Sequence, residues 1–278
     1  MFKKKFGFTL AEGATHVNSP QTKAKFGFTL AEVLITLGII GVVAAITIPN
    51  LIANQQKKAI GSQIAEAQSI LTQAVRQYSA DTDEEGSAEF ETTLSPQAFA
   101  EKYFKPYLKI ARICTKMEDS CWKTGDFYGF YNLDGTKYTD HLEYSYVLNN
   151  GMIIGFSKID ATSLMSIIVD VNGQGKRNVL GKDVFVFYPY NSANLCNTGT
   201  ERYKNIKNGI YPGGFDACGT PHAIYSREEL LNKEGRILRP CSKAGYTLNY
   251  GGRTGLGTAC AAVIFKDGWK ISNDYPWN

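Results

Sequence analysis

Residues 25–45 read Lys-Phe-Gly-Phe-Thr-Leu-Ala-Glu-Val-Leu-Ile-Thr-Leu-Gly-Ile-Ile-Gly-Val-Val-Ala-Ala, and this stretch decides how the 278-residue chain is organised. Between Glu32 and Lys57 lie 24 residues without a charged side chain. A helix of that length reaches about 36 Å, against about 30 Å for the hydrocarbon core of a bilayer. We therefore predict a transmembrane segment over residues 30–53. A buried core helix is disfavoured because such helices are seldom charge-free for so long.

The segment before this helix carries the net charge of the chain. The whole sequence has a formal charge of +4, and its first 27 residues contain five lysines and one glutamate. Residues 28–278 are therefore neutral, with 25 basic and 25 acidic side chains. A nucleic-acid-binding surface normally needs a basic excess, so no nucleic-acid partner is expected. Positive residues just before an apolar run instead hold that end of a chain in the cytoplasm.

Glu32 is unusual because it places a carboxylate at the start of the apolar run. A carboxylate inside a bilayer costs roughly 2.5–3.5 kcal/mol on insertion scales, so it needs a partner. No basic residue follows Glu32 for a full membrane span. A cut after Gly27 would create an amino group on Phe28, four residues before Glu32, and would remove all five leader lysines. This new amine is the nearest candidate partner.

The segment 25–45 closely resembles the N-terminus of type IV prepilins and type II secretion pseudopilins. In that family a prepilin peptidase cuts after the glycine and methylates the new phenylalanine. The glutamate at the fifth mature position then neutralises the terminal amine of a neighbouring subunit. The resemblance implies cleavage after Gly27, N-methylation of Phe28 and an assembly role for Glu32, with the neighbouring Phe28 amine as its only partner. Pro49 matches the helix-breaking proline of the family.

Pro49 also has a physical interpretation of its own. Proline removes a backbone hydrogen bond and clashes with the preceding turn, so we expect a kink or local melting around residues 47–50. The alternative is that Pro49 only marks the membrane exit. Beyond it, apolar residues at three- and four-residue steps predict a helix to about Tyr78 that packs on a globular head. This stripe comprises Ile60, Ile64, Ala67, Leu71, Ala74, Val75 and Tyr78.

The octapeptide Lys-Phe-Gly-Phe-Thr-Leu-Ala-Glu occurs twice, at residues 5–12 and 25–32. A polar sequence follows the first copy, so no membrane segment presents that copy to an inner-membrane peptidase. We therefore expect cleavage after Gly27 rather than Gly7, which makes residues 1–27 a leader. The first copy is interpreted as a duplicated leader or an upstream start-site artefact.

Residues 81–278 predict a β-rich globular head behind an N-terminal helix over residues 28–80. Ser95 and Pro96 open a short helix as its N-cap and first turn. Several strand-like runs follow, two of them joined by an Asn-Gly hairpin turn. The runs are Phe127–Tyr131, Tyr144–Leu148, Met152–Phe156, Leu164–Val171 and Val184–Tyr188. One long helix packed on an antiparallel sheet is an α+β architecture, which is also how pilin heads look.

The loop 170–183, between the last two of these runs, resembles a loop that recurs in pseudopilin-type heads. Its oxygen-bearing side chains Asp170, Asn172 and Asp183 are of the kind that hold calcium. In the alternative, Asp170 and Asn172 make Asx-turn bonds and Gly173 supplies a positive φ. The alternative is favoured because the loop offers few ligands. Calcium stays open, and no other cofactor is expected.

The six cysteines favour disulfides over a zinc site, because none forms a Cys-x-x-Cys pair. A chain exported through its N-terminus meets an oxidising compartment, where pairing is expected. Cys114 and Cys121 enclose six residues and are expected to pair. Sequence proximity favours Cys196–Cys218 and Cys241–Cys260 among three alternatives. Beyond Tyr188 we expect disulfide-held loops with one helical stretch, Arg227–Asn232, rather than a second hydrophobic core.

No catalytic constellation is found, so no enzyme activity is expected. The three histidines, at 16, 141 and 222, lie in no nucleophile or metal motif, and no P-loop or Gly-x-Ser-x-Gly elbow occurs. The favoured function is a minor pilin or pseudopilin of a type IV pilus or type II secretion pseudopilus. The alternative is an adhesion or ligand-binding protein displayed on a pilin-like helix.

The resemblance implies a set of partners and a location. The partners are a prepilin peptidase, other pilin or pseudopilin subunits, an inner-membrane assembly platform and the lipid bilayer. The location is the bacterial inner membrane, with the head in the periplasm or outside, and then the filament. Secretion, adhesion, motility and DNA uptake share this N-terminus, so the sequence does not choose among them.

Overall fold

Helix α1 extends without interruption from Leu30 to Asp81 and contains Pro49. The expected local melting around residues 47–50 is therefore wrong, and the kink at Pro49 stays a prediction. A proline removes only one hydrogen bond of the helical ladder, and the rest of this 52-residue helix continues on either side of it. The hydroxyl of Thr47 adds a bond in the same turns by donating to the carbonyl oxygen of Val43 at 2.9 Å.

The computed structural model describes residues 27–82, 89–91, 93–115, 121–124, 127–138, 142, 144–158, 165–173, 177–190, 208–213, 225–231, 240–243 and 256–277. The chain divides into two units, Met1–Asn50 and Leu51–Asn278. The described part of the first unit is the beginning of α1. The second unit contains the rest of α1 and the head. The predicted boundaries after residues 27 and 80 stay predictions.

The second half of α1 packs on the head through one face, as its apolar periodicity predicts. Every residue of the predicted stripe from Ile60 to Tyr78 is buried, and all belong to the main core cluster. The ring of Tyr78 contacts that of Tyr103 edge-on, with 4.7 Å between centroids. The 3.6-residue period therefore correctly identified both the helix and the face that it buries.

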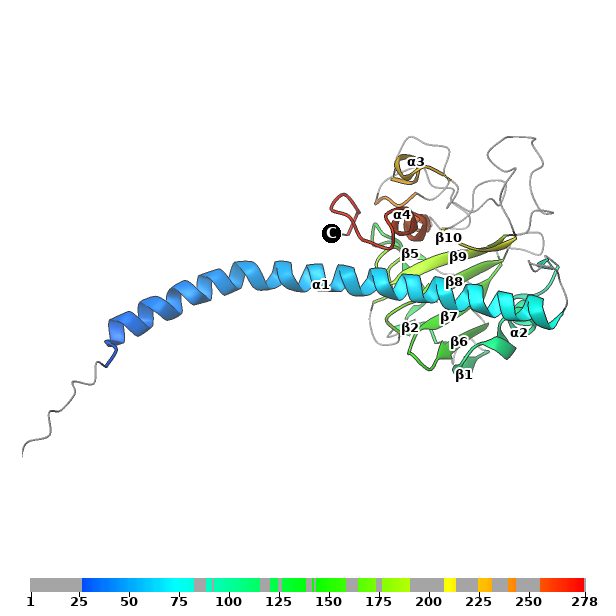
Figure 1. Ribbon diagram of the computed structural model, residues 1–278, viewed down its shortest axis with the longest axis horizontal. Helices are drawn as coiled ribbons and strands as arrows, with labels where there is room; N and C mark the ends of the chain where they lie inside the picture. The colour runs from blue at the N-terminus through cyan, green and yellow to red at the C-terminus, as the bar shows by residue number, and fades with distance from the viewer. Residues whose placement is uncertain are drawn as a thin grey trace, which may run out of the picture. The chain divides into compact units, whose positions relative to one another are not determined.

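The head is built on a six-stranded antiparallel sheet with the order β1-β6-β7-β8-β9-β10. Its strands are β1 (Ile110–Cys114), β6 (Tyr144–Leu148), β7 (Ile153–Ser157), β8 (Ser166–Asp170), β9 (Val184–Tyr190) and β10 (Gly209–Pro212). The predicted hairpin is confirmed, because β6 and β7 pair across a turn in which Gly151 has φ 87°. Figure 1 shows α1 crossing one face of this sheet.

Two core clusters share the sheet, one on each face. Along the strands, neighbouring side chains alternate between the clusters, as the two-residue period of a strand requires. Ile154 and Ile167 join the stripe of α1 in the main cluster, whereas Ile153 and Ile168 join the second cluster around Trp122. The strands are therefore buried on both faces, which explains their nearly continuous apolar sequence.

Two small ladders lie outside the main sheet. β2 (Lys123–Thr124) pairs with β3 (Phe127–Tyr128), and β4 (Phe130–Tyr131) pairs with β5 (Lys137–Tyr138). The rings of Phe130 and Tyr138 stack across the second ladder with centroids 4.8 Å apart. Both rings belong to the second cluster, so this ladder helps to cover that face of the sheet.

The short helices include one that the sequence analysis missed. The predicted α2 (Pro96–Tyr103) begins at an N-cap Ser95 whose hydroxyl oxygen accepts a bond from the Ala98 amide. A 3-10 helix η1 (Lys105–Tyr107) follows it, and α3 (Arg227–Leu231) lies at the predicted helical stretch. The expectation of loops near the C-terminus fails at α4 (Cys260–Lys266), whose residues up to Ile264 extend the main core.

Candidate functional site: the N-terminal assembly segment

The first turn of α1 forms a reciprocal capping box between Thr29 and Glu32. The backbone amide and the hydroxyl of Thr29 each donate to Oε2 of Glu32 at 2.8 Å. In return, the backbone amide of Glu32 donates to the Thr29 hydroxyl oxygen at 3.2 Å. Two amides that a helix start normally leaves without partners are thereby satisfied.

This geometry corrects the interpretation of Glu32. The sequence analysis assigned it the neighbouring Phe28 amine as its only partner, yet the carboxylate has donors within its own chain. The signal was in the sequence, since a threonine followed three residues later by a glutamate before an apolar run is a capping-box signature. The carboxylate also lies at the positive end of the helix dipole, which stabilises it further.

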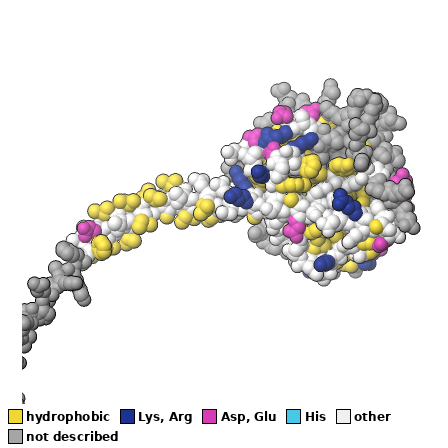
Figure 2. Space-filling view, viewed as in Figure 1, with side chains coloured by type: hydrophobic (Ala, Val, Ile, Leu, Met, Phe, Trp, Pro, Cys, Tyr) yellow, Lys and Arg dark blue, Asp and Glu magenta, His cyan; other side chains and the backbone are white. Residues whose placement is uncertain are grey.

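The apolar side chains of the first unit are exposed all around the helix. Phe28 is 86% exposed, and the large hydrophobic residues from Leu30 to Ile48 are exposed as well. The hydroxyl of Thr36, one of the few polar groups here, donates to the carbonyl of Val33 at 2.9 Å. A helix that is apolar on every side needs a membrane or a protein partner around it. Figure 2 shows this apolar surface in yellow.

Length and composition also make α1 a candidate membrane span. Its most apolar stretch has a mean hydropathy of 2.4, and none of that stretch is buried by the rest of the protein. Among the described residues, α1 alone passes this test. The predicted transmembrane segment at residues 30–53 falls within it, whereas the buried stripe of the head begins at Ile60.

The loop between β8 and β9 brings its three candidate ligands together as a hydrogen-bonded turn. Oδ1 of Asp170 accepts from the amides of Asn172 and Gly173 at 3.0 and 2.9 Å. Gly173 has φ 73°, and a Cβ there would overlap the carbonyl oxygen of Gly151. This is the Asx turn of the favoured alternative.

Asp183 closes the same loop from the other side. Its carboxylate accepts from the Val179 amide and from Nδ2 of Asn172, the latter at 3.3 Å. Burial raises the pKa of the Asp183 carboxyl, and these bonds oppose that rise. Calcium takes six to eight oxygen ligands. Here the three side chains bond the loop and one another, as the Asx-turn alternative expects, and calcium binding stays a prediction.

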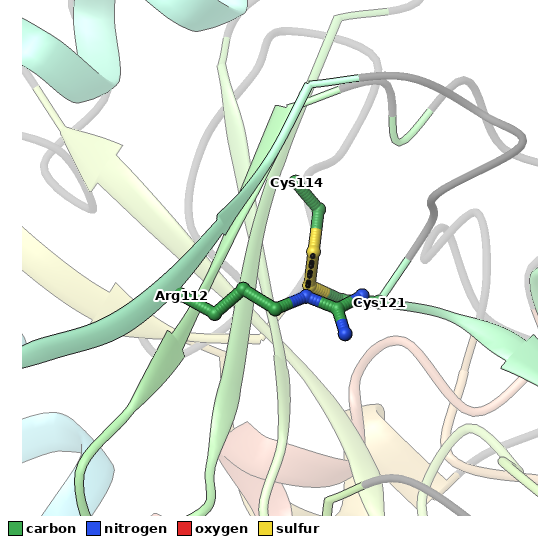
Figure 3. Close-up of a disulfide and its surroundings, with 3 residues drawn as sticks. All are labelled: Arg112, Cys114 and Cys121. Atoms are coloured by element: carbon green, nitrogen blue, oxygen red, sulfur yellow. Dashed lines mark hydrogen bonds between the residues drawn. A yellow bond between two sulfur atoms is a disulfide. The ribbon is translucent and has the colours of Figure 1, made fainter.

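The described disulfides are the pairs that sequence proximity favours. Cys114 at the end of β1 bonds Cys121, and Nε of Arg112 donates to Sγ of Cys114 at 3.3 Å (Figure 3). Cys241 bonds Cys260 at the start of α4. The predicted pair Cys196–Cys218 lies outside the described residues. The two described bonds tie an edge strand and the C-terminal helix to the head.

A comparison with known families identifies the N-terminal segment. Residues 22–48 match the model of the prokaryotic N-terminal methylation motif, the prepilin-type cleavage signal. The match falls on the second of the two octapeptide copies. The chain therefore combines a prepilin-type N-terminus with an α+β head.

These features support a type IV pilin-like or pseudopilin-like protein with a structural role. The motif and the apolar helix also fit anchoring in the inner membrane. No curated protein and no solved structure matches the chain significantly. The resemblance therefore rests on the N-terminal segment, and the head is described by its own structure.

Proposed function

We propose that the chain is a structural subunit, a minor pilin or pseudopilin, of a type IV pilus or type II secretion pseudopilus. One observation carries the proposal: the methylation motif at residues 22–48 leads into a helix that is apolar on every side. The same helix then continues into the head and buries its opposite end there. It is thus suited to carry a folded head on a segment that packs among other helices.

In the proposed pathway a prepilin peptidase cuts after Gly27 and methylates the new amine of Phe28. The partners would be other pilin or pseudopilin subunits and the inner-membrane assembly platform, with the head on the periplasmic side. Before assembly, the Thr29 capping bonds satisfy Glu32 within its own chain. In the filament, the amine of a neighbouring Phe28 provides a partner of opposite charge, whose coulombic attraction the neutral Thr29 donors do not supply.

The duplicated octapeptide offers a matched test of processing. The full chain is co-expressed with a prepilin peptidase, and the mass of its N-terminal peptide is measured. We expect loss of 27 residues and a methylated Phe28. Gly27→Leu should leave the precursor uncut in the membrane, whereas Gly7→Leu should be processed normally. A terminus at Phe8, or processing of the Gly27→Leu chain at its usual bond, would overturn the proposed cleavage.

A second candidate function, ligand binding by the head, is favoured by a groove of about 380 Å³ beside α1. Its apolar lining includes Ile70, Leu108 and Leu148, and Gln77 and Asn149 add polar groups. Binding sites for small ligands typically measure about 300–1,000 Å³ and combine these two kinds of lining. Ile70→Trp should fill the groove. Loss of surface attachment with normal filament assembly would support this function, and unchanged attachment would exclude the groove from it.

A further inference from the structure

Residues 265–277, which comprise the end of α4 and the chain after it, lie against α1 at Gly61. A Cβ at Gly61 would overlap the carbonyl oxygen of Trp269, so only glycine permits this approach. Trp269 itself has φ 64°, and its amide donates to the carbonyl of Ile264 at 2.8 Å. Figure 1 shows this segment, in red, beside the helix. We call residues 265–277 the C-terminal segment.

An ion-pair network holds the C-terminal segment in place. The guanidinium of Arg227 on α3 bonds the carboxylates of Asp267 and Asp274, and it also donates to the Ser272 hydroxyl at 2.8 Å. These bonds lower the pKa of the Asp274 carboxyl and raise that of Arg227. The one arginine thus bonds both acids of this segment and compensates the charge of one of them.

A buried hydrogen bond and a disulfide fix the segment further. The hydroxyl of Tyr275 donates to the carbonyl of Gly181 in the loop before β9, and Tyr275 is buried. The bond between Cys241 and Cys260 anchors the start of α4 just ahead of the segment. The C-terminal segment is therefore a rigid part of the head surface rather than a loose tail.

The position of Gly61 along α1 brings this surface close to the predicted membrane span. Ala53 ends that span, and at about 1.5 Å per residue Lys57 lies about 6 Å and Gly61 about 12 Å beyond it. The headgroup region adds roughly 5–7 Å on each side of the hydrocarbon core. Lys57 and Lys58 precede Gly61 by four and three residues, so they lie on its face of the helix.

The charges and aromatic rings here suit a lipid headgroup surface. Lys266 and Lys270 on the C-terminal segment and Lys58 on α1 are exposed, and Lys57 is half-buried. Phe265 is 41% exposed and meets the ring of Trp269 edge-on at 5.3 Å. Figure 2 shows Lys and Arg side chains gathered where α1 enters the head. Tryptophan concentrates at membrane interfaces, and lysine clusters bind anionic headgroups.

We propose that the C-terminal segment, together with Lys57 and Lys58, forms a juxtamembrane surface that binds anionic phospholipid headgroups before assembly. The inference rests on the proposed membrane span of α1. Because Arg227 leaves only one of the two acidic charges of Asp267 and Asp274 uncompensated, the four lysines give this surface a net positive charge. The surface holds the head against the bilayer until the subunit leaves the membrane.

The test uses the full chain reconstituted into vesicles of phosphatidylcholine, alone or mixed with phosphatidylglycerol. The quencher is phosphatidylcholine that carries a nitroxide spin label on its headgroup. The fluorescence difference between wild type and Trp269→Phe isolates the signal of Trp269. We expect that signal to be quenched in the anionic vesicles. Lys266→Gln with Lys270→Gln should leave α1 inserted but reduce the ratio of heads docked on the bilayer to undocked heads, on the order of fivefold for each lysine removed.

Arg76→Gln with Lys109→Gln is the matched control, because both cations are exposed. Arg76 lies 15 residues beyond Gly61 on α1, and Lys109 lines the groove beside that part of the helix. This control should leave the quenching unchanged. Equal quenching in neutral vesicles, or none in anionic ones, would overturn the inference. Resistance to alkaline carbonate reports insertion of α1 separately. Extraction by carbonate would overturn the membrane span and with it the proposed function, whereas an inserted chain with unquenched Trp269 overturns this inference alone.

Discussion

Replacing Leu71 by alanine should destabilise the head strongly, because Leu71 is fully buried between α1 and the sheet. Leucine-to-alanine changes at such sites cost about 3–5 kcal/mol, from lost burial and the cavity left behind. For a unit of this size each kcal/mol lowers Tm by roughly 2–4 °C, so we expect a decrease of about 6–20 °C. That is a large part of the total stability of a typical domain, about 5–15 kcal/mol.

The matched control is the same substitution at Leu51, which lies on the same helix but is 60% exposed. Surface changes of this kind stay within about 0.5 kcal/mol. The assay is thermal unfolding of the full, oxidised chain in detergent, followed by near-ultraviolet circular dichroism of the buried aromatic residues. Equal shifts for Leu71→Ala and Leu51→Ala would refute the assignment of the buried face.

Three further predictions concern filament assembly, the disulfide between Cys241 and Cys260, and the pH dependence of stability. Glu32→Ala should insert and be cleaved but be depleted from sheared filaments, because the carboxylate that pairs with a neighbouring amine is gone; assembly at the wild-type level would contradict this. Cys241→Ser with Cys260→Ser opens a loop with a sequence separation of 19 and should cost about 3 kcal/mol, measured as a lower Tm. The pKa of Asp274 lies below its ordinary value of 3.8, so the stability from its pair with Arg227 is present above that pH and lost as pH falls below it. In melts at decreasing pH, Asp274→Asn should therefore lose less stability than wild type, and an identical acid profile would argue against the pair.

The long helix and the hairpin could be predicted because their signals are local. The burial of Ile60, Leu71 and Tyr78 follows from a 3.6-residue period, and the turn at Gly151 follows from an Asn-Gly pair. Helix α4 was missed for the opposite reason. Its run of five buried residues from Cys260 to Ile264 has no polar face. A short run that is apolar throughout shows no hydrophobic periodicity, so its sequence does not distinguish a helix from a strand.

The candidate site was predictable in its residues but not in all its contacts. The Thr29–Glu32 box follows from a local sequence pattern, a threonine followed three residues later by a glutamate at a helix start, whereas the charge of Glu32 by itself indicates only that a partner is needed. The ion pairs of Arg227 could not be predicted from the sequence, because the partners Asp267 and Asp274 lie 40 and 47 residues away along the chain. Only the folded chain brings such residues together.

We propose that this chain is a processed filament subunit, and the most direct test is the N-terminal peptide of the chain recovered from sheared filaments. Mass spectrometry should find it beginning with N-methylated Phe28 in the filament fraction, alongside the other subunits. Recovery of the chain only from membranes, or a filament-associated chain that still carries residues 1–27, would contradict this proposal.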